Sequence, residues 1–247
     1  MQNLMSVVLA AGKGTRLQSE KSDLPKVMRS AAGKPLLQYV LESISFIGKQ
    51  ETILVVGYKK EEIIKNFGEY TFAHQTEQLG TGHAVMSAAD ALEDFTGDVL
   101  VCYGDMPLLT RDTYLSLVTE HRKNNNGCTV LSGTSELSLP YGRIVRDAKG
   151  NFLRVVEDRD CTEEERAITE LNIGVYVFNS QKLLSALKHL GNKNSQGEYY
   201  LTDVPEILLA QGTRLGICKL ELGYEIIGVN TASQLALVEK IIKERSK

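Results

Sequence analysis

The sequence has no long apolar run, no excess of basic charge and no closely spaced pair of cysteines. Its longest apolar runs have the length of strands, which excludes a membrane-spanning helix. The formal net charge is −3, so no global basic field recruits nucleic acid. The N-terminal stretch "MQNLMSVVLAAGKG" lacks the basic region of a signal peptide. We therefore expect a cytoplasmic protein that binds neither nucleic acid nor a membrane.

The sequence also lacks a linker, an internal repeat and any low-complexity segment. Its four cysteines are scattered without metal-type spacing, which argues against a zinc site and fits core residues in a reducing compartment: Cys102, Cys128, Cys161 and Cys218. What is present is an ordinary globular balance, with 43% hydrophobic and 24% charged residues over 247 positions. This length is enough for a sizeable core.

Strand-like and helix-like segments alternate through the first half of the chain. Buried strand patterns, such as "LMSVVLA", "TILVVGY" and "DVLVCYGD", are each followed by apolar residues at helical spacing. This order predicts a parallel sheet with helices on both faces. In the second half, from about residue 141, the apolar period tends towards two, which predicts an added antiparallel layer. The sequence thus predicts an α/β fold with a Rossmann-like, doubly wound mixed sheet.

The stretch "LAAGKGTRLQSEKSDLPKVM" follows the first predicted strand and has the composition of a phosphate-binding loop. It is not a Walker A loop, because Gly14 stands where serine or threonine must follow Lys13. It is not a dinucleotide fingerprint either, because Leu17 replaces the third glycine. Two glycines alone could simply permit a strand-to-helix turn. Here, however, open backbone amides are combined with cations that suit a triphosphate or pyrophosphate: Lys13, Arg16 and Lys26.

This stretch and several later motifs resemble those of a known enzyme family. "LAAGKGTR…LPK" is similar to the signature of the sugar-nucleotide pyrophosphorylases, and further motifs follow in order: "QTEQLGTGHA", "YGDMPLL", "YGRIVRD", "VVEDRDCTEEER", "ELNIGVYVF", "NSQGEYYLTD" and "GVNT". Together they resemble the N-acetylglucosamine-1-phosphate uridyltransferase domain of the bifunctional GlmU family. The resemblance implies a nucleotide-diphospho-sugar transferase (GT-A-like) fold over residues 1–230. Its nucleotide-binding half would be about 1–110 and its sugar-binding half about 111–230, before a C-terminal helix at 231–247.

The resemblance also implies a Mg²⁺ site made by Asp105 and Asn230. An aspartate at the end of a buried strand often only caps a turn, but next to a phosphate loop it can hold Mg²⁺, which takes few protein ligands. Asn230 could instead be the N-cap of the final helix. The pairing of these two residues comes from the resemblance and not from their spacing.

The substrate contacts are likewise carried over from the family. A glutamine amide can match the edge of a pyrimidine, and the resemblance implies that Gln75 and Gly80 contact uracil. The nucleotide-binding residues would be Leu9, Ala10, Ala11, Gly12, Gly14, Thr15, Gln75, Gly80 and Thr81. The sugar-binding residues would be Tyr103, Gly104, Gly142, Glu157 and Asn172. Without the resemblance, the local sequence would favour Glu157 as an exposed carboxylate at the end of a strand.

The implied reaction is an in-line attack by the phosphate of N-acetylglucosamine 1-phosphate on the α-phosphorus of UTP. The products are UDP-N-acetylglucosamine and pyrophosphate. Such chemistry depends on positioning and charge neutralisation more than on a general base. We expect Lys26 to contact the attacking and α-phosphates, and Arg16 to contact the leaving pyrophosphate, so these two residues are the catalytic candidates.

The sequence departs from the bifunctional family in one respect. It contains none of the hexapeptide repeats of the left-handed β-helix that carries acetyltransferase activity there. We therefore expect no β-helix trimer, and a monomer or weak dimer. Other functions remain open: a sugar-1-phosphate nucleotidylyltransferase with another base or sugar, or a non-catalytic protein that binds a nucleotide sugar.

Overall fold

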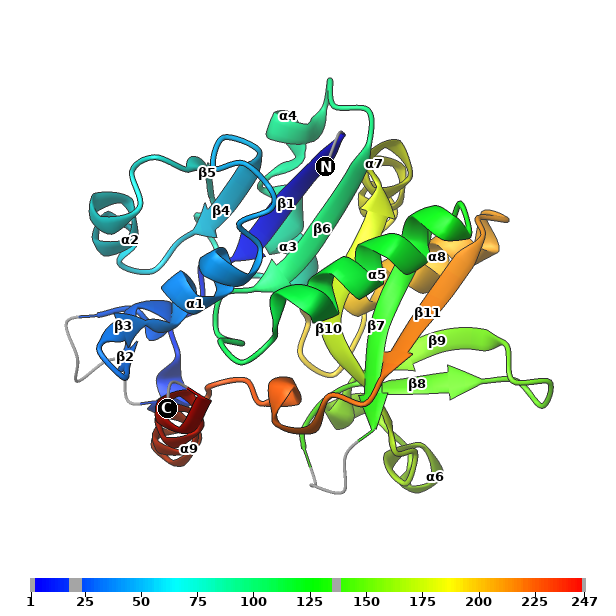
Figure 1. Ribbon diagram of the computed structural model, residues 1–247. Coiled ribbons are helices and arrows are strands. Elements are labelled where there is room, and N and C mark those ends of the chain that lie inside the picture. The colour runs from blue at the N-terminus through cyan, green and yellow to red at the C-terminus, as the bar shows by residue number, and fades with distance from the viewer. Residues whose placement is uncertain (1–2, 18–23, 135–138, 246–247) are drawn as a thin grey trace.

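The structure is a computed structural model, and it describes residues 3–17, 24–134 and 139–245 (Figure 1). Residues 18–23 of the glycine-rich stretch and residues 135–138 lie outside these ranges. None of the helices in the described part of the chain is long and apolar enough to cross a membrane. The strands are β1 (Leu4–Leu9), β2 (Ser30–Ala31), β3 (Lys34–Pro35), β4 (Thr52–Val56), β5 (Thr71–His74), β6 (Asp98–Tyr103), β7 (Cys128–Thr134), β8 (Arg143–Arg146), β9 (Phe152–Val156), β10 (Glu170–Asn179) and β11 (Leu215–Leu220).

One mixed sheet organises the molecule, in the order β11-β7-β10-β6-β1-β4-β5. β1 lies parallel to β4 and β6, which confirms the parallel arrangement predicted for the first half. The long strand β10 is antiparallel to both β6 and β7. The antiparallel part is therefore not a separate layer. β10 is inserted into the middle of the sheet, and the hairpin β8–β9 branches from it through a pairing of Leu171 with Arg143.

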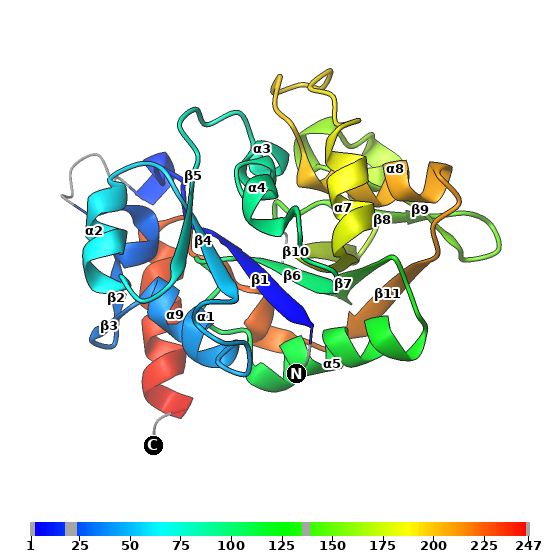
Figure 2. The ribbon, with the colours of Figure 1, turned by 90° about the horizontal axis from the view of Figure 1, so that it is seen from above.

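Helices cover both faces of the sheet, as Figure 2 shows from above. They are α1 (Leu36–Ser43), α2 (Lys60–Asn66), α3 (Thr81–Met86), α4 (Ala89–Leu92), α5 (Arg111–Lys123), α6 (Glu163–Arg166), α7 (Ser180–Leu187), α8 (Val204–Ala210) and α9 (Ala232–Arg245). Thr110 caps α5, because its side chain accepts a hydrogen bond from the backbone N–H of Thr113. The stretch "TGHAVMSAADAL" has apolar residues at the spacing of one helix over 81–92, but the structure divides it into α3 and α4.

Each strand of the parallel part sends alternate side chains into two hydrophobic cores. Val8 and Leu54 pack with α1, α2 and α5 on one face. Their neighbours Val7 and Ile53 pack with α3, α4, α7 and α8 on the other face. This two-residue period explains why the strands are apolar throughout, since both faces are buried.

A third hydrophobic cluster holds the C-terminal helix on the N-terminal part of the chain. Val238 and Ile241 of α9 pack with Leu17, Ala31 and other buried residues. Ala31 belongs to a small hairpin of β2 and β3, which the sequence patterns did not predict. This packing brings the segment just before α9 to the carboxyl ends of β1 and β6, where open α/β sheets bind ligands.

Candidate active site

Lys26 lies at the centre of a charged cluster. It begins a turn of 3₁₀ helix, Lys26–Met28, directly after Pro25, whose φ of −66° fixes the approach of the chain. The Lys26 ammonium contacts the carboxylate of Asp105 and donates a hydrogen bond of 3.0 Å to Oδ1 of Asn230. Arg16 Nη2 lies 3.5 Å from the same Asn230 oxygen. The fold therefore brings together both predicted catalytic residues and both predicted metal ligands.

The segment that carries Asn230 is fixed to the end of β6. The backbone N–H of Val229 donates to the carbonyl of Asp105 at 2.9 Å. Helix α9 is capped by Thr231, whose hydroxyl accepts from the Gln234 backbone, while Gln234 Oε1 accepts from the backbones of Thr231 and Asn230. Because Thr231 and Gln234 cap the helix, the Asn230 side chain is free to contact Lys26. The alternative of Asn230 as the cap is therefore wrong.

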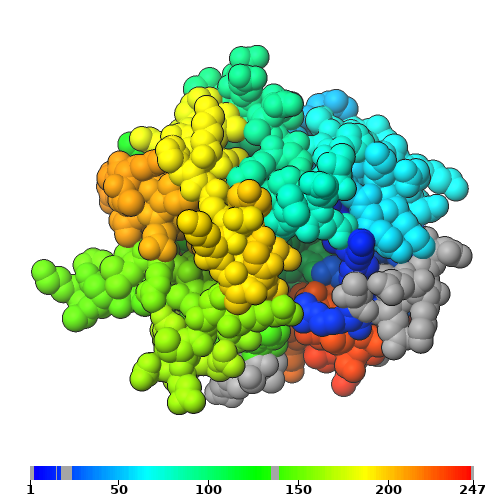
Figure 3. All heavy atoms as spheres, turned by 180° about the vertical axis from the view of Figure 1, so that it is seen from behind, coloured from blue at the N-terminus to red at the C-terminus, as the bar shows by residue number. Residues whose placement is uncertain are grey.

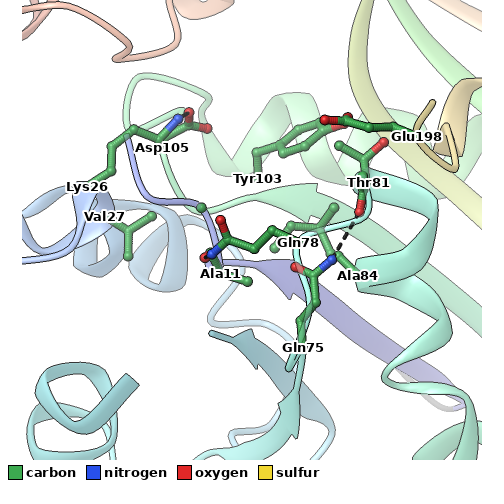
Figure 4. A pocket seen from close by; sticks show the side chains of 13 residues that line it. Ala11, Lys26, Val27, Gln75, Gln78, Thr81, Ala84, Tyr103, Asp105 and Glu198 are labelled. Atoms are coloured by element: carbon green, nitrogen blue, oxygen red, sulfur yellow. Dashed lines mark hydrogen bonds and ion pairs between the residues drawn. The ribbon is translucent and has the colours of Figure 1, made fainter. Parts of the chain in front are cut away.

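A first cavity of about 240 Å³ lies beside this cluster, at the ends of β1 and β5. Figure 4 shows Lys26 and Asp105 at one end of it, with the side chains of Gln75 and Gln78 further along. Gln75 is buried, and its Nε2 donates to the carbonyl of Gly80 and to His83 Nδ1, both at 3.1 Å. Gln78 donates to the carbonyl of Ala11 at 2.8 Å. The cavity thus presents amide groups of the kind that recognise the edge of a base.

A backbone contact closes one wall of the first cavity. Gly80 has φ +108°, and a Cβ there would lie 2.6 Å from the carbonyl oxygen of Tyr199. The N–H of Gly82 donates to that same carbonyl at 2.8 Å, and the N–H of Leu201 donates to Thr81 Oγ1 at 3.0 Å. The segment 198–201 is therefore fixed to the wall of the first cavity, although it lies more than a hundred residues further along the chain.

A second cavity of about 270 Å³ lies on the other side of the charged cluster. Three of the residues predicted to bind the sugar line this cavity: Gly142, Glu157 and Asn172. Both ends of the Asn172 amide are bonded, because Nδ2 donates to the hydroxyl of Tyr176 at 2.7 Å and Oδ1 accepts from the backbone of Gly174 at 3.3 Å. Asn172 is thus held rigidly in the wall.

The two cavities meet at Lys26, Tyr103 and Asp105, which line both of them. Burial raises the pKa of the Tyr103 phenol, which keeps it a neutral hydrogen-bonding group. A space-filling view from behind shows the surface hollowed where the N-terminal atoms, in blue, meet the teal, gold and yellow-green segments (Figure 3). A ligand that spans both cavities would pass over the Lys26 ammonium.

Of the other positions predicted to bind substrate, some line a cavity and some do not. Leu9, Ala11, Gly12 and Thr81 line the first cavity. Three other predicted positions are absent from the described walls of both cavities: Ala10, Gly14 and Gly104. The side chain of Thr15, also predicted to bind the nucleotide, lies outside the described part of the structure. The N–H of Ala10 donates to the carbonyl of Val55, and the N–H of Gly104 donates to the carbonyl of Leu9. Ala10 and Gly104 therefore support the cavities from behind.

The sequence analysis missed several residues that line the cavities, among them Glu198 and Tyr141. Glu198 lines the first cavity. Tyr141 lines the second cavity, and its hydroxyl donates to the carbonyl of Ile226 at 2.6 Å and accepts from the backbone of Gly228 at 2.9 Å. The motifs "GEYYLTD" and "YGRI" contain these residues, but no local pattern shows what they touch.

The donor atoms at Asp105 and Asn230 suit a hard divalent cation. Both donors are oxygens, and both contact the same ammonium, so they face one small volume. Within residues 3–17, 24–134 and 139–245, no three His, Cys, Asp or Glu side chains form a metal-binding group. A cation here would therefore have few protein ligands, as Mg²⁺ does when it is bound together with phosphates.

Comparisons with known proteins agree on one family. A family model described as nucleotidyl transferase matches residues 5–243. The chain is 44% identical over 246 residues to the bifunctional protein GlmU of Acetivibrio thermocellus, covering 99% of this chain and 53% of that protein. It is 42% identical over 241 residues to the same-named protein of Streptococcus gordonii, covering 97% of this chain and 52% of that protein. The chain thus spans about half the length of these curated relatives.

A solved structure shares the fold. The crystal structure of UDP-glucose pyrophosphorylase complexed with UDP-glucose matches with a TM-score of 0.77 and 18% identity, covering 99% of this chain and 100% of that one. The nucleotide-diphospho-sugar transferase fold expected from the motifs is thereby confirmed.

Proposed function

The chain belongs to the nucleotidyl transferase family and is a nucleotidyltransferase, and we propose that it transfers a uridylyl group from UTP to N-acetylglucosamine 1-phosphate. The products would be UDP-N-acetylglucosamine and pyrophosphate. Two further proposals accompany this one, namely that Mg²⁺ is the metal and that the protein works in the cytoplasm.

The observation that carries the proposal is the meeting of two cavities at one cationic centre. Amide groups face the first cavity, and a carboxylate and a buried asparagine line the second. Lys26 belongs to both. A reaction that joins a nucleotide to a sugar phosphate needs this arrangement, because each substrate requires its own pocket and the phosphorus under attack must lie between them. The likeness to the GlmU proteins supports the same assignment.

The residues of this centre supply positioning and charge. The attacking group is already an ionised phosphate oxygen, so the protein need not remove a proton from it. That oxygen bonds to the α-phosphorus of UTP while the bond to the bridging oxygen of pyrophosphate breaks. We assign Lys26 to the phosphates being joined, because it lies where the cavities meet. Arg16, which lines the second cavity close to Asn230, is assigned to the leaving pyrophosphate.

Asp105 and Asn230 are the residues that would hold Mg²⁺. When bound, the ion would neutralise charge on the phosphate oxygens. Lys26 contacts both donor oxygens in the structure, so the cation and the ammonium would share one small region of negative charge. Removal of divalent cations by EDTA is expected to stop pyrophosphate release, and addition of Mg²⁺ is expected to restore it.

Base selection would depend on Gln75 and Gly80. A buried site that hydrogen-bonds one base edge rejects a different edge, because its polar groups are then left unpaired.

On the sugar side, Glu157 and Asn172 would bind hydroxyl or acetamido groups. The placement of these residues in two neighbouring cavities supports the expected division into a nucleotide half and a sugar half, although both halves share one sheet.

The decisive experiment measures pyrophosphate release across a matrix of nucleoside triphosphates and sugar 1-phosphates. The proposal expects the highest kcat/KM for UTP with N-acetylglucosamine 1-phosphate. Comparable turnover with CTP or dTTP would overturn the assignment of the base. A preference for glucose 1-phosphate would overturn the assignment of the sugar. Binding of UDP-N-acetylglucosamine without turnover of any pair would show a non-catalytic binding protein.

A further inference from the structure

Thr202 makes a buried contact with Glu157 that the proposed mechanism does not yet use. The hydroxyl of Thr202 donates a hydrogen bond of 2.9 Å to Oε1 of Glu157. Thr202 is only 2% exposed. Among the residues that the structure describes, no other side chain donates to the Glu157 carboxylate. Thr202 therefore decides how this carboxylate is turned in the wall of the second cavity.

The turn that carries Thr202 is itself fixed at several points. Tyr199 N–H donates to the carbonyl of Leu79 at 2.8 Å, and the Tyr199 carbonyl accepts from Gly82. One residue before Thr202, the N–H of Leu201 donates to Thr81 Oγ1. These bonds attach the turn Leu201–Asp203 to the wall of the first cavity. Because the turn is fixed before ligand binds, the Thr202 hydroxyl can keep the Glu157 carboxylate in one orientation. Ligand binding then costs little conformational entropy at this carboxylate.

We propose that Thr202 is a positioning residue for sugar recognition, which holds the Glu157 carboxylate in the orientation that accepts hydrogen bonds from the sugar of the nucleotide sugar. This inference rests on the proposed function, since it assigns the second cavity to the sugar. Glu157 contacts the sugar, and Thr202 acts through Glu157. Thr202 does not line either cavity.

The electrostatic surroundings give the bond a second role. Burial raises the pKa of Glu157, the hydrogen bond from Thr202 lowers it, and the charges of Asp160, Asp158 and Glu198 raise it again. Arg16, Lys26 and Asp105 line the second cavity together with Glu157. Further charged side chains line another cavity beside Glu157: Arg154, Glu165, Lys193, Asp203 and Glu206. Without the Thr202 hydroxyl, the pKa of Glu157 would rise further, and the carboxylate would become protonated at a higher pH.

Calorimetric binding of UDP and of UDP-N-acetylglucosamine to the purified protein tests the inference. The variants are Thr202→Val, which removes the hydroxyl at nearly constant shape, and Thr202→Ser, which retains it. We expect Thr202→Val to weaken UDP-N-acetylglucosamine about tenfold and to leave UDP unchanged, because a hydrogen bond to a charged group is lost only on the sugar side. Thr202→Ser should bind both ligands like the wild type.

The pH dependence gives a second readout. The affinity for UDP-N-acetylglucosamine should fall on acidification as Glu157 becomes protonated, and in Thr202→Val this fall should begin at higher pH. A merely structural role would not move this profile. Should the valine variant fail to fold, Thr202→Ala provides the same comparison.

Thr52→Val is the matched control. Thr52 is also buried, and its hydroxyl donates to the carbonyl of Gly48 at 3.0 Å. It begins β4, at the amino end of a strand whose carboxyl end faces the first cavity. This variant should leave both affinities unchanged. Equal affinities of wild type and Thr202→Val, or an equal loss for UDP and UDP-N-acetylglucosamine, would overturn the role of Thr202. A wild type that binds the two ligands equally well would instead overturn the assignment of the second cavity to the sugar.

Discussion

The ammonium of Lys26 contacts the carboxylate of Asp105 at the point where the two cavities meet. The two side chains are 15% and 12% exposed, so water screens their attraction only weakly. Lys26 also donates to Asn230, so one cation gathers side chains that lie 79 and 204 positions away in the chain. The charged centre is therefore assembled from three separate segments, and each of them can be tested.

Lys26→Ala should lower kcat by about two to three orders of magnitude, roughly 3–4 kcal/mol, with a smaller change in the KM for UTP. The reason is that charge develops on the phosphates in the transition state, where a fixed cation matters most. Lys26→Arg should restore activity only in part, because a planar fork does not replace a compact ammonium. The control is Lys49→Ala, which breaks an exposed ion pair with Glu69. Equally mild kinetic effects of the two alanine variants would contradict the assignment.

A double-mutant cycle of Lys26→Ala and Asp105→Ala should show a coupling of about 1–3 kcal/mol in the free energy of unfolding. Each single variant leaves one charge unpaired in a largely buried place, whereas the double variant leaves no unpaired charge there. Urea unfolding of the four proteins measures this coupling. The exposed pair of Lys49 with Glu69 should show a smaller coupling in the same assay. Additive effects at Lys26 and Asp105 would show that the contact adds nothing to stability.

Gly80→Ala should destabilise the protein more than Gly150→Ala and should also raise the KM for UTP. Both glycines have positive φ, +108° and +83°, so either substitution strains the backbone by about 1 kcal/mol. Only at Gly80 would the new Cβ collide, at 2.6 Å from the carbonyl oxygen of Tyr199, whereas nothing lies within 4 Å at Gly150. Thermal unfolding and UTP kinetics of both variants test this difference. Similar melting temperatures and KM values would contradict it.

Asp203→Asn should stabilise the protein at pH 7 and flatten its stability profile in the acidic range. Burial, followed by the charges of Glu206, Glu157 and Asp160, raises the pKa of Asp203 from 3.8 to about 6. Between these values the folded state binds more protons than the unfolded state, so stability falls as the pH rises through this window. Because Asp203 is partly exposed, we expect a gain of only about 1 kcal/mol at pH 7.

Urea midpoints at pH 4 and pH 7 measure this effect. Asp147 provides a comparison of opposite sign, because hydrogen bonds from Asn151 lower its pKa. Asp147→Asn should therefore reduce stability at pH 7 and have less effect at low pH. A loss of stability in Asp203→Asn at pH 7 would show that its carboxylate is stabilised by its surroundings.

Local sequence patterns predicted most of the elements and the family. Apolar runs located β1, β4 and β6, because both faces of these strands are buried and nearly every position in them is therefore apolar. The glycine-rich loop and the ordered motifs predicted a nucleotidyltransferase, and the match over residues 5–243 confirms this. The patterns failed where packing overrides periodicity. The hairpin of β2 and β3 is too short to show a period, and the break between α3 and α4 carries neither glycine nor proline.

The sequence by itself determined which chemical groups this protein has and on which local elements they lie. Only the tertiary structure decided which of them meet. Asn230 reaches Lys26 because α9 packs on the N-terminal segment and is capped by Thr231 and Gln234. Thr202 reaches Glu157 because the turn that carries it is bonded to the wall of the first cavity. Neither contact leaves a local signal, since the distance between residues remote in sequence is set by strand order and by the packing of the cores, and not by spacing along the chain.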